Sequence, residues 1–317
     1  MIMMRMRSLT LTALAVLMVG VTAFGGRVED ALPSETLTTV TGKAASGRLT
    51  TDFTEHLDLK VVSKGGAVTR RHETVFFDSE KDALTKEFEQ SPNYVSLNGV
   101  WDFRYYGSVQ EMLAASRAAS KAAQEPSQST AAQNAPSTIN VPGNWEVQGF
   151  GTAVYVNIPY EFCPRNPQPP RLPDMIPTGV YSRTITPEFG EGEKCYLNLC
   201  GVKGGAYVFV DEQFVGYGED SKDLVRYDIT PFVRSGKEAV LRLVVTRWCT
   251  GSYLECQDFW RISGIERDVY LSREPATVPD DFDWNVVATL ADDLGTGDFR
   301  LTVNSSDPVN VGWRLLD

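Results

Sequence analysis

The side chains best suited to chemistry are concentrated in one loop-rich stretch, Arg247–Leu271, which reads RWCTGSYLECQDFWRISGIERDVYL. It holds arginines, carboxylates and tryptophans: Arg247, Arg261, Arg267, Glu255, Asp258, Glu266, Trp248 and Trp260. Asp258 stands directly before the aromatic pair Phe259-Trp260. A carboxylate accepts hydrogen bonds from hydroxyl groups and an aromatic ring stacks on C–H faces, so this combination suits a sugar. The spacing alone is more often explained by an ion-pair network that fixes a loop around core tryptophans.

A second candidate is Asn157, which lies near the end of the short strand predicted at Val154–Ile158. The glycines Gly149 and Gly151 precede it and leave the backbone free to form a loop. An asparagine side chain offers both a donor and an acceptor to a sugar hydroxyl. The competing interpretation is an asparagine that forms a turn by hydrogen bonding to its own backbone.

Short strands must position these side chains. From Val180 onward we expect strands at Val180–Ile185, Lys194–Leu199, Ala206–Val210, Gln213–Tyr217, Val225–Ile229 and Val240–Trp248. In the last of them Leu241, Leu243 and Val245 fall on one face. Short alternating strands at regular spacing predict an antiparallel sandwich. At Asp211-Glu212 we expect a longer loop, because a tight hairpin turn needs positive φ at both central residues, which glutamate disfavours.

The stretch resembles the end of the N-terminal sugar-binding domain of bacterial β-galactosidases of glycoside hydrolase family 2. The matching residues are Trp248, Gly251 to Glu255, Gln257 to Arg261, Ser263 to Ile265 and Arg267 to Val269, and the departure is Cys256, where the family often has Asp. Further matches are Ser-Leu-Asn-Gly-x-Trp ending at Trp101, Val-Pro-x-Asn-Trp-Glu around Trp145, and Tyr-x-Asn ending at Asn157. The resemblance extends from about His72 to the C-terminus.

The resemblance implies an all-β chain: a jelly-roll, galactose-binding-like β-sandwich followed by an immunoglobulin-like β-sandwich. We expect a leader and N-terminal arm over residues 24–92, the jelly-roll domain over 93–273 and a partial immunoglobulin-like domain over 274–317. The last domain is expected to be truncated, because Asp283–Thr289, Phe299–Val303 and Val311–Leu316 supply fewer than the roughly seven strands of such a sandwich. Residues 24–60 show no convincing period and are expected to be a flexible leader.

The resemblance also implies hydrolysis of terminal non-reducing β-D-galactose residues with retention, through two carboxyl groups. In the family both glutamates lie on a TIM barrel that follows the immunoglobulin-like domain, so we expect no catalytic residue in this chain and regard the barrel as its missing partner. The asparagine matching Asn157 contacts galactose, and the aspartate matching Asp258 helps to hold galactose and a sodium ion. Sodium and magnesium, and a homo-oligomer, are implied only for a full-length member.

Other functions remain open. The chain could be a non-catalytic carbohydrate-binding module, part of a sister β-glucuronidase or β-mannosidase, or a structural or adhesion sandwich. The formal net charge of −11 argues against nucleic acid as a partner, since phosphate binding needs a basic surface.

The N-terminus has the pattern of a secretory signal peptide over residues 1–23. Arg5 and Arg7 precede the apolar run Leu9–Val21, and Val21–Ala23 offers a small-residue cleavage site. We therefore expect a periplasmic or secreted protein.

The five cysteines leave at least one thiol unpaired. Cys249 and Cys256 flank one turn and could pair, whereas Cys195 and Cys200 point to opposite faces of a strand and should not. The isolated histidines His56 and His72 are expected at surface or packing positions rather than as metal ligands.

Overall fold

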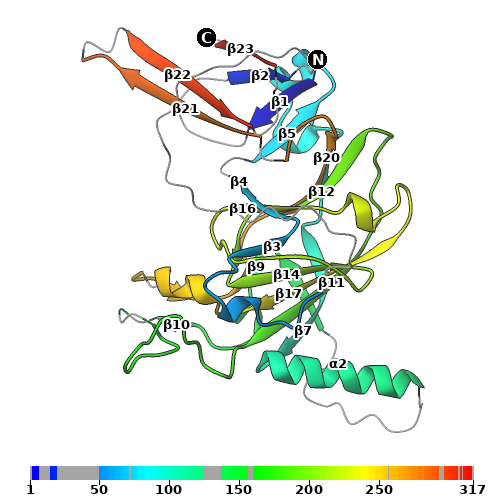
Figure 1. Cartoon of the computed structure of the whole chain (residues 1–317), viewed down its shortest axis with the longest axis vertical. Coiled ribbons are helices and arrows are strands. Elements are labelled where there is room, and N and C mark those ends of the chain that lie inside the picture. The colour runs from blue at the N-terminus through cyan, green and yellow to red at the C-terminus, as the bar shows by residue number, and fades with distance from the viewer. Residues whose placement is uncertain are drawn as a thin grey trace. The chain divides into compact units, whose positions relative to one another are not determined.

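A computed structural model describes residues 2–6, 15–19, 50–70, 73–124, 137–155, 157, 160–255, 257–280, 282–292, 296–305, 308 and 310–315. The chain divides into two compact units. The larger unit comprises Leu49–Glu73 and Tyr94–Arg273, and the smaller unit comprises Met1–Arg48, Thr74–Asn93 and Glu274–Asp317. Strands outnumber helices in the described parts of both units (Figure 1).

The larger unit is a sandwich of two antiparallel sheets. The seven-stranded sheet has the order β3-β15-β14-β17-β11-β7-β8, and the five-stranded sheet has the order β4-β16-β12-β20-β6. The strands of the first sheet are β3 (Ser63–Gly65), β7 (Gly99–Tyr106), β8 (Ser137–Val141), β11 (Thr178–Ile185), β14 (Gly205–Val210), β15 (Gln213–Gly218) and β17 (Ala239–Thr246). Those of the second are β4 (Ala67–Arg70), β6 (Tyr94–Ser96), β12 (Glu193–Leu199), β16 (Leu224–Asp228) and β20 (Val269–Pro275).

Short elements complete this unit at its margins. They are β9 (Gly143–Asn144), β10 (Val154–Tyr155), β13 (Val202–Lys203), β18 (Trp260–Arg261), β19 (Gly264–Ile265), and the 3-10 helices η1 (Glu55–Leu57), η3 (Glu146–Gln148), η4 (Thr230–Phe232) and η5 (Thr250–Leu254). The sequence predicts a surface helix over Glu111–Gln124 that ends at Glu125-Pro126, because the residue before a proline avoids the helical region. The structure has helix α2 (Val109–Gln124), which begins where the Ser108 hydroxyl accepts a hydrogen bond from the Glu111 amide. None of the described helices is long and apolar enough to cross a membrane.

The core lies between the two sheets and follows the alternation read from the sequence. Leu241, Leu243 and Val245 all face it, as predicted, and meet apolar side chains of the opposite sheet such as Leu197. Trp101, the last residue of the Ser-Leu-Asn-Gly-x-Trp motif, is predicted as a core residue and is buried. Because each strand alternates inward and outward residues, a single apolar layer holds both sheets together. The expected fold class, an all-β jelly-roll sandwich, is confirmed for this unit.

The turn between β14 and β15 corrects the expected longer loop. Val210 pairs directly with Gln213, so Asp211 and Glu212 are the two central residues of a tight hairpin. Both have positive φ, 46° and 61°. The Asp211 carboxylate accepts a hydrogen bond from the Val240 amide at 2.8 Å, so contacts with the neighbouring strand stabilise a conformation that the residue types alone disfavour.

Part of the expected flexible leader belongs to the larger unit. In the described segment 50–70, β3 pairs with β15 and β4 pairs with β16, which places the segment at the edges of both sheets. His56 is buried and shares a hydrogen bond with the Tyr207 hydroxyl at 2.8 Å, so it is a packing residue. His72 lies outside the described residues. The segment packs through a few isolated side chains rather than through a whole apolar face. Its hydrophobic residues therefore show no regular period.

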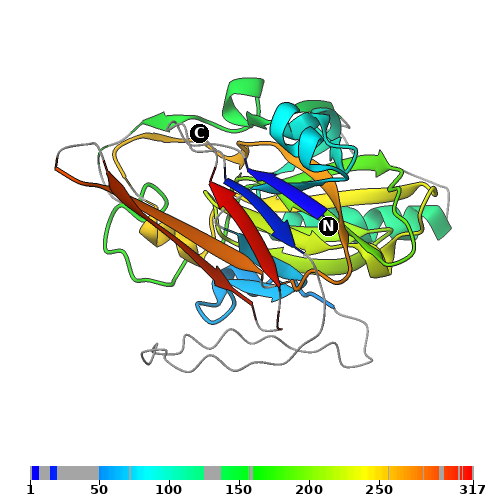
Figure 2. The ribbon, with the colours of Figure 1, turned by 90° about the horizontal axis from the view of Figure 1, so that it is seen from above.

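The smaller unit contains a four-stranded sheet and a two-stranded ribbon. Its strands are β1 (Ile2–Met6), β2 (Ala15–Val19), β5 (Thr74–Phe77), β21 (Asp283–Leu290), β22 (Gly297–Asn304) and β23 (Val311–Leu315), with the helix α1 (Glu80–Thr85) and the 3-10 helix η2 (Phe88–Gln90). Figure 2 shows β23 in red beside the blue strands β1 and β2, and β21 with β22 as a long orange ribbon. Phe76, Val278, Phe282 and Trp284 form its core. This packing fits the immunoglobulin-like sandwich expected here.

Residues 1–23 were expected to lie outside the fold as a signal peptide. In the structure, β1 pairs with both β2 and β5, and β2 pairs with β23. The described part of the apolar run, Ala15–Val19, thus pairs its backbone in a sheet.

The cysteines follow the expected pattern where they are described. Cys195 and Cys200 are both buried and are not bonded to each other, as expected from their opposite directions on the strand. Cys249 is a free, buried thiol, so the possible disulfide between Cys249 and Cys256 is not formed in this structure. Cys256 itself lies outside the described residues.

Candidate functional site

Two short strands, β10 and β18, pair outside the two main sheets and carry the candidate site. Their register joins Val154 to Arg261 and Tyr155 to Trp260. Tyr155 and Trp260 are 57% and 54% exposed, and their ring centroids lie 5.5 Å apart. Arg261 points the other way and is buried. One face of the strand pair therefore presents an exposed aromatic pair to solvent.

The Asp258 carboxylate lies beside the Tyr155 hydroxyl of this pair. Hydrogen bonding with Asp258 and the negative charge of its carboxylate raise the pKa of Tyr155, because the carboxylate stabilises the protonated hydroxyl. Asp258 is exposed, and so is Asn157, two residues beyond Tyr155. Asn157 lies two residues beyond the end of β10 and Asp258 two residues before the start of β18. Their direct contact stays a prediction.

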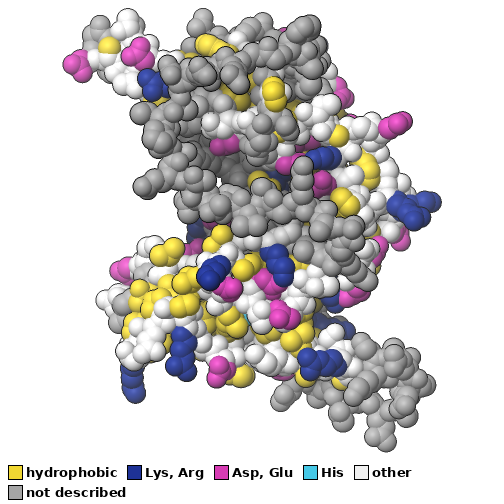
Figure 3. All heavy atoms as spheres, in the orientation of Figure 1, with side chains coloured by type: hydrophobic (Ala, Val, Ile, Leu, Met, Phe, Trp, Pro, Cys, Tyr) yellow, Lys and Arg dark blue, Asp and Glu magenta, His cyan; other side chains and the backbone are white. Residues whose placement is uncertain are grey.

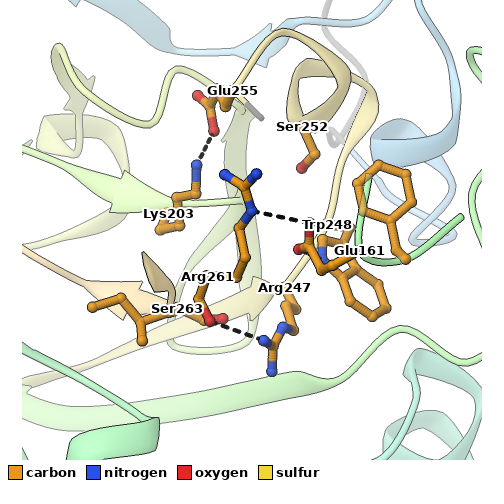
Figure 4. A pocket seen from close by; sticks show the side chains of 10 residues that line it. Glu161, Lys203, Arg247, Trp248, Ser252, Glu255, Arg261 and Ser263 are labelled. Carbon is orange, nitrogen blue, oxygen red and sulfur yellow. Dashed lines mark hydrogen bonds and ion pairs between the residues drawn. The ribbon is translucent and has the colours of Figure 1, made fainter. Parts of the chain in front are cut away.

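The inward side of the same stretch is an ion-pair network (Figure 4). Arg247 pairs with Glu146 at 3.1 Å, Arg261 with Glu161 at 3.4 Å, and Lys203 with Glu255 at 2.6 Å. All six side chains are buried or nearly so, and such charges are stable in a protein only when they are paired. The structural interpretation therefore holds for Arg247, Arg261 and Glu255, whereas Asp258 and Trp260 face solvent.

Phe259 links the two sides of the stretch. Lys203 Nζ lies 5.6 Å and the Arg261 guanidinium 5.1 Å from the centroid of its ring. Two cations over one ring give favourable cation–π contacts and fix the phenyl group on the inward side. Its neighbours Asp258 and Trp260 are both exposed, whereas Phe259 is half-buried.

Glu219 holds the loop before Asp258 in place. Its carboxylate accepts hydrogen bonds from the Tyr217 hydroxyl at 2.6 Å and from the Thr250 hydroxyl at the start of η5. Burial raises the pKa of Glu219, although these hydrogen bonds oppose the rise. Glu219 thus ties η5 to the seven-stranded sheet.

Three contributors to the site were not predicted from the sequence: Tyr155 as a contact of Asp258, and Glu146 and Glu219 as supports. Glu146 appeared only as the last residue of a motif, and Glu219 carried no signal at all. Their roles depend on contacts between segments far apart in the chain, which spacing does not reveal. The Tyr-x-Asn motif was the one available pointer to Tyr155.

The described residues do not form a complete metal site. They contain no cluster of three or more His, Cys, Asp or Glu side chains that could hold a metal ion. Asp258 and Asn157 could together offer two side-chain oxygens, and hard cations such as calcium or magnesium take about six or more oxygen ligands. The expected sodium ligand Asp258 therefore fits only as one part of a site completed elsewhere.

Apolar side chains gather around this edge. Figure 3 shows hydrophobic groups in yellow over the part of this face where Figure 1 labels β10. Besides Tyr155 and Trp260, Leu254 at the end of η5 is 83% exposed. Exposed apolar groups beside a carboxylate are typical of a binding surface rather than of an ordinary loop.

An antiparallel jelly-roll sandwich with a carboxylate and an aromatic pair at its margin defines a β-sandwich domain of the kind found in glycoside hydrolases. Residues 94–275 match the family model described as the sugar binding domain of glycosyl hydrolases family 2. The chain belongs to this family, as its motifs indicated.

Among curated proteins, a β-galactosidase of Yersinia pestis bv. Antiqua (strain Angola) is 35% identical over 202 residues, which are 63% of this chain and 18% of the relative. A β-galactosidase of Yersinia pseudotuberculosis serotype O:1b (strain IP 31758) is also 35% identical over 202 residues, 63% of this chain and 17% of the relative. The chain thus spans less than a fifth of the length of these relatives.

Solved structures with a similar fold include two β-glucuronidases. That of Bifidobacterium dentium, complexed with coumarin-3-O-glucuronide, has a TM-score of 0.43 and 14% identity over 72% of this chain and 43% of its own. That of Faecalibacterium prausnitzii has a TM-score of 0.41 and 16% identity over 70% of this chain and 37% of its own.

Proposed function

We propose that this chain supplies part of the substrate-binding site of a β-galactosidase, an enzyme that hydrolyses terminal non-reducing β-D-galactose residues. The observation that carries the proposal is the exposed aromatic pair Tyr155 and Trp260 on β10 and β18, with the Asp258 carboxylate beside the Tyr155 hydroxyl. It is supported by curated β-galactosidases that are 35% identical over 63% of the chain. The two catalytic carboxyl groups would belong to a barrel domain outside these 317 residues.

In this proposal the chain binds and orients the sugar. The free lone pairs of the Asp258 carboxylate accept hydrogen bonds from galactose hydroxyls, and the Asn157 amide both donates and accepts. The rings of Tyr155 and Trp260 offer faces for the C–H groups of the sugar. Such contacts raise the rate because they hold the glycosidic bond in position between the barrel's two carboxyl groups. A sodium ion would use Asp258 as one oxygen ligand.

The charges around the site favour a neutral sugar over a uronic acid. Arg247, Arg261 and Lys203, the cations nearest to the strand pair, each pair with a glutamate. Because each is already neutralised by a glutamate, none of the three offers a free charge to a glucuronate carboxylate.

The test uses the longer protein that contains this region and the barrel. Its kcat/KM is compared for chromogenic β-galactoside, β-glucuronide and β-mannoside substrates that share one leaving group. We expect the galactoside to be preferred by roughly 100-fold or more, which is about 2.7 kcal/mol of transition-state stabilisation. A preference for the glucuronide or the mannoside would overturn the assignment. The 317 residues alone should not hydrolyse the galactoside.

A non-catalytic carbohydrate-binding module is the second candidate, because the exposed pair Tyr155 and Trp260 would also suit a free-standing sugar platform. Binding of glycans by the 317-residue chain, measured on a glycan array, would favour it. Absence of binding there, with activity in the longer protein, favours the composite enzyme site.

We further propose that the protein is exported, so that its galactoside substrates lie in the periplasm or outside the cell. The support is the basic start, apolar run and small-residue site within residues 1–23.

A further inference from the structure

The strand pair that carries the candidate site is too short to define its own geometry. The described pairing of β10 with β18 spans two register pairs. An isolated two-stranded pair is marginally stable in water, so residues outside the ladder must hold it in place. Arg247, which directly follows β17, makes the contacts that could do this.

The Arg247 guanidinium bridges the two segments. Its Nη2 donates to the backbone carbonyl of Thr152, just before β10, at 3.3 Å, and to that of Arg261 in β18 at 3.1 Å. Figure 4 shows the guanidinium turned toward the Arg261 segment, with the second contact dashed. One planar group thus touches the backbone of both strands that carry the proposed sugar contacts.

The guanidinium is itself held rigidly. Arg247 is 7% exposed, and its Nη1 lies 3.1 Å from Glu146 Oε1. The Glu146 carboxylate also accepts hydrogen bonds from the Ser263 amide at 2.8 Å and the Ser263 hydroxyl at 2.9 Å. A fixed fork of donors keeps its geometry better than a flexible ammonium does.

The backbone of Arg247 is tied to the sandwich. Its amide donates to the Pro177 carbonyl at 2.8 Å, directly before β11, and β17 pairs with β11 along its whole length. The side chain of Arg247 therefore fixes β10 and β18 relative to the seven-stranded sheet. Trp248 packs beside it, with the guanidinium 5.4 Å from the centroid of the indole ring.

We propose that Arg247 is a positioning residue that sets the spacing of β10 and β18, and through them the relative placement of Asn157 and Asp258. What this margin binds rests on the proposed function, whereas the bridging contact rests on geometry alone. A lysine at this position keeps the charge opposite Glu146 but cannot reach both carbonyls and the carboxylate at once.

The first test measures amide hydrogen exchange in the 317-residue chain carrying Arg247→Lys. The matched control is Arg242→Lys on the same strand, where the arginine is more exposed and pairs with Glu212 at 2.5 Å. We expect exchange of the amides of Val154–Tyr155 and Trp260–Arg261 to accelerate at least tenfold in Arg247→Lys and to stay unchanged in the control. Unchanged exchange at these strands, or equal acceleration throughout the main sheets, would overturn the proposal.

A second variant keeps the test informative should Arg247→Lys fail to fold. Glu146→Gln preserves the guanidinium and its two carbonyl contacts but removes the charge that holds it. We expect a smaller acceleration of amide exchange, confined to the same strands. If exchange in these strands does not change, the bridging role is contradicted.

The functional arm uses the longer, barrel-containing protein. Arg247→Lys should raise KM for a β-galactoside by roughly tenfold with a smaller change in kcat, since displaced binding groups weaken ground-state and transition-state binding alike. If Asn157→Ala impairs turnover and Arg247→Lys does not, the positioning role fails and the proposed function stands. If neither Asn157→Ala nor Asp258→Asn has any effect while exchange in Arg247→Lys is still faster, the proposed function fails and the bridging contact stands.

Discussion

The Asp258 carboxylate lies beside the Tyr155 hydroxyl and raises the pKa of Tyr155, which brings together two segments that are far apart in the sequence. The contact joins a residue of β10 to the loop that precedes β18. The Asp258 carboxylate keeps further lone pairs for a ligand. A carboxylate oriented in this way is more useful for binding a sugar than one that rotates freely, because less side-chain freedom is lost on binding.

Replacing Asp258 or Asn157 should therefore impair activity without affecting the fold. In the barrel-containing protein, we expect Asp258→Asn and Asn157→Ala to lower kcat/KM for a β-galactoside by roughly 10–1000-fold. Thermal unfolding should change little, because both side chains are exposed.

Steady-state kinetics and calorimetry on the same preparations check this prediction. Glu188→Gln, which changes another exposed carboxylate, is the control and should leave both measurements unchanged. A lower melting temperature with near-normal activity would show that the two residues serve the fold instead.

Removing only the hydroxyl of Tyr155 should have a milder effect. Tyr155→Phe keeps the ring beside Trp260 but releases Asp258, so we expect kcat/KM to fall by roughly 3–10-fold, the size of one lost neutral-to-charged hydrogen bond at a solvent-exposed site. Tyr155→Ala, which also removes the stacking face, should be worse. Equal losses in the two variants would show that the ring adds nothing beyond the hydroxyl, and parent-like kinetics of Tyr155→Phe would show that the hydroxyl plays no part.

Local patterns predicted much of this fold. Alternation along Leu241, Leu243 and Val245 identified a core-facing strand, and the Pro126 boundary gave the end of the surface helix α2. The motifs around Asn157 and Asp258 identified two segments that the structure then pairs as β10 and β18. Each of these features depends on neighbours within a few residues, which is the range over which periodicity carries information.

Contacts between distant segments were not predictable in this way. Asp211 adopts positive φ because Val240, on another strand, donates to its carboxylate. His56 is buried by Tyr207, and Arg247 reaches the carbonyl of Thr152. In each case a residue distant in the sequence overrides or supplements the local conformational preference, and the flanking residues do not reveal which residue that is.

His56 should make the larger unit less stable in mild acid. Burial lowers the pKa of His56 from 6.5 to about 4, so between these values the unfolded chain binds more protons than the folded chain. Stability therefore rises with pH across this window, and folding loses up to about 3 kcal/mol by pH 4 relative to pH 7.

Urea denaturation at pH 7, 5.5 and 4.5 tests this with His56→Gln, whose amide can still bond to the Tyr207 hydroxyl. The variant should lose less stability than the parent chain as the pH falls. Parallel stability curves for the two proteins would show that His56 does not contribute to the acid sensitivity.

Export predicts a shorter mature chain. Signal peptidase acting after Val21-Thr22-Ala23 would leave Phe24 at the N-terminus, and the smaller unit would lose β1 and β2. Intact-mass measurement on periplasmic or secreted material should show the loss of residues 1–23. Ala23→Arg, which removes the small residue at the cleavage site, should prevent processing. A mature protein that retains Met1 would contradict export by this route.

The tight turn at Asp211-Glu212 offers a stabilising substitution. Glu212 has φ of 61°, a region in which a side chain other than glycine is strained by about 1 kcal/mol or more. Glycine removes that strain but adds freedom to the unfolded chain, so the net gain for Glu212→Gly should be about 0.5 kcal/mol. The ion pair with Arg242 is lost, yet Glu212 is 67% exposed and such surface pairs contribute little.

Glu212→Ala is the matched control for this turn, because it loses the same ion pair while keeping a β-carbon at positive φ. Urea denaturation should place Glu212→Gly above the parent chain in stability and Glu212→Ala at or below it. Equal stability of the two variants would mean that the backbone strain is absent. A less stable Glu212→Gly would mean that the contact with Arg242 outweighs the strain, and that the hairpin is held by side chains rather than limited by its backbone.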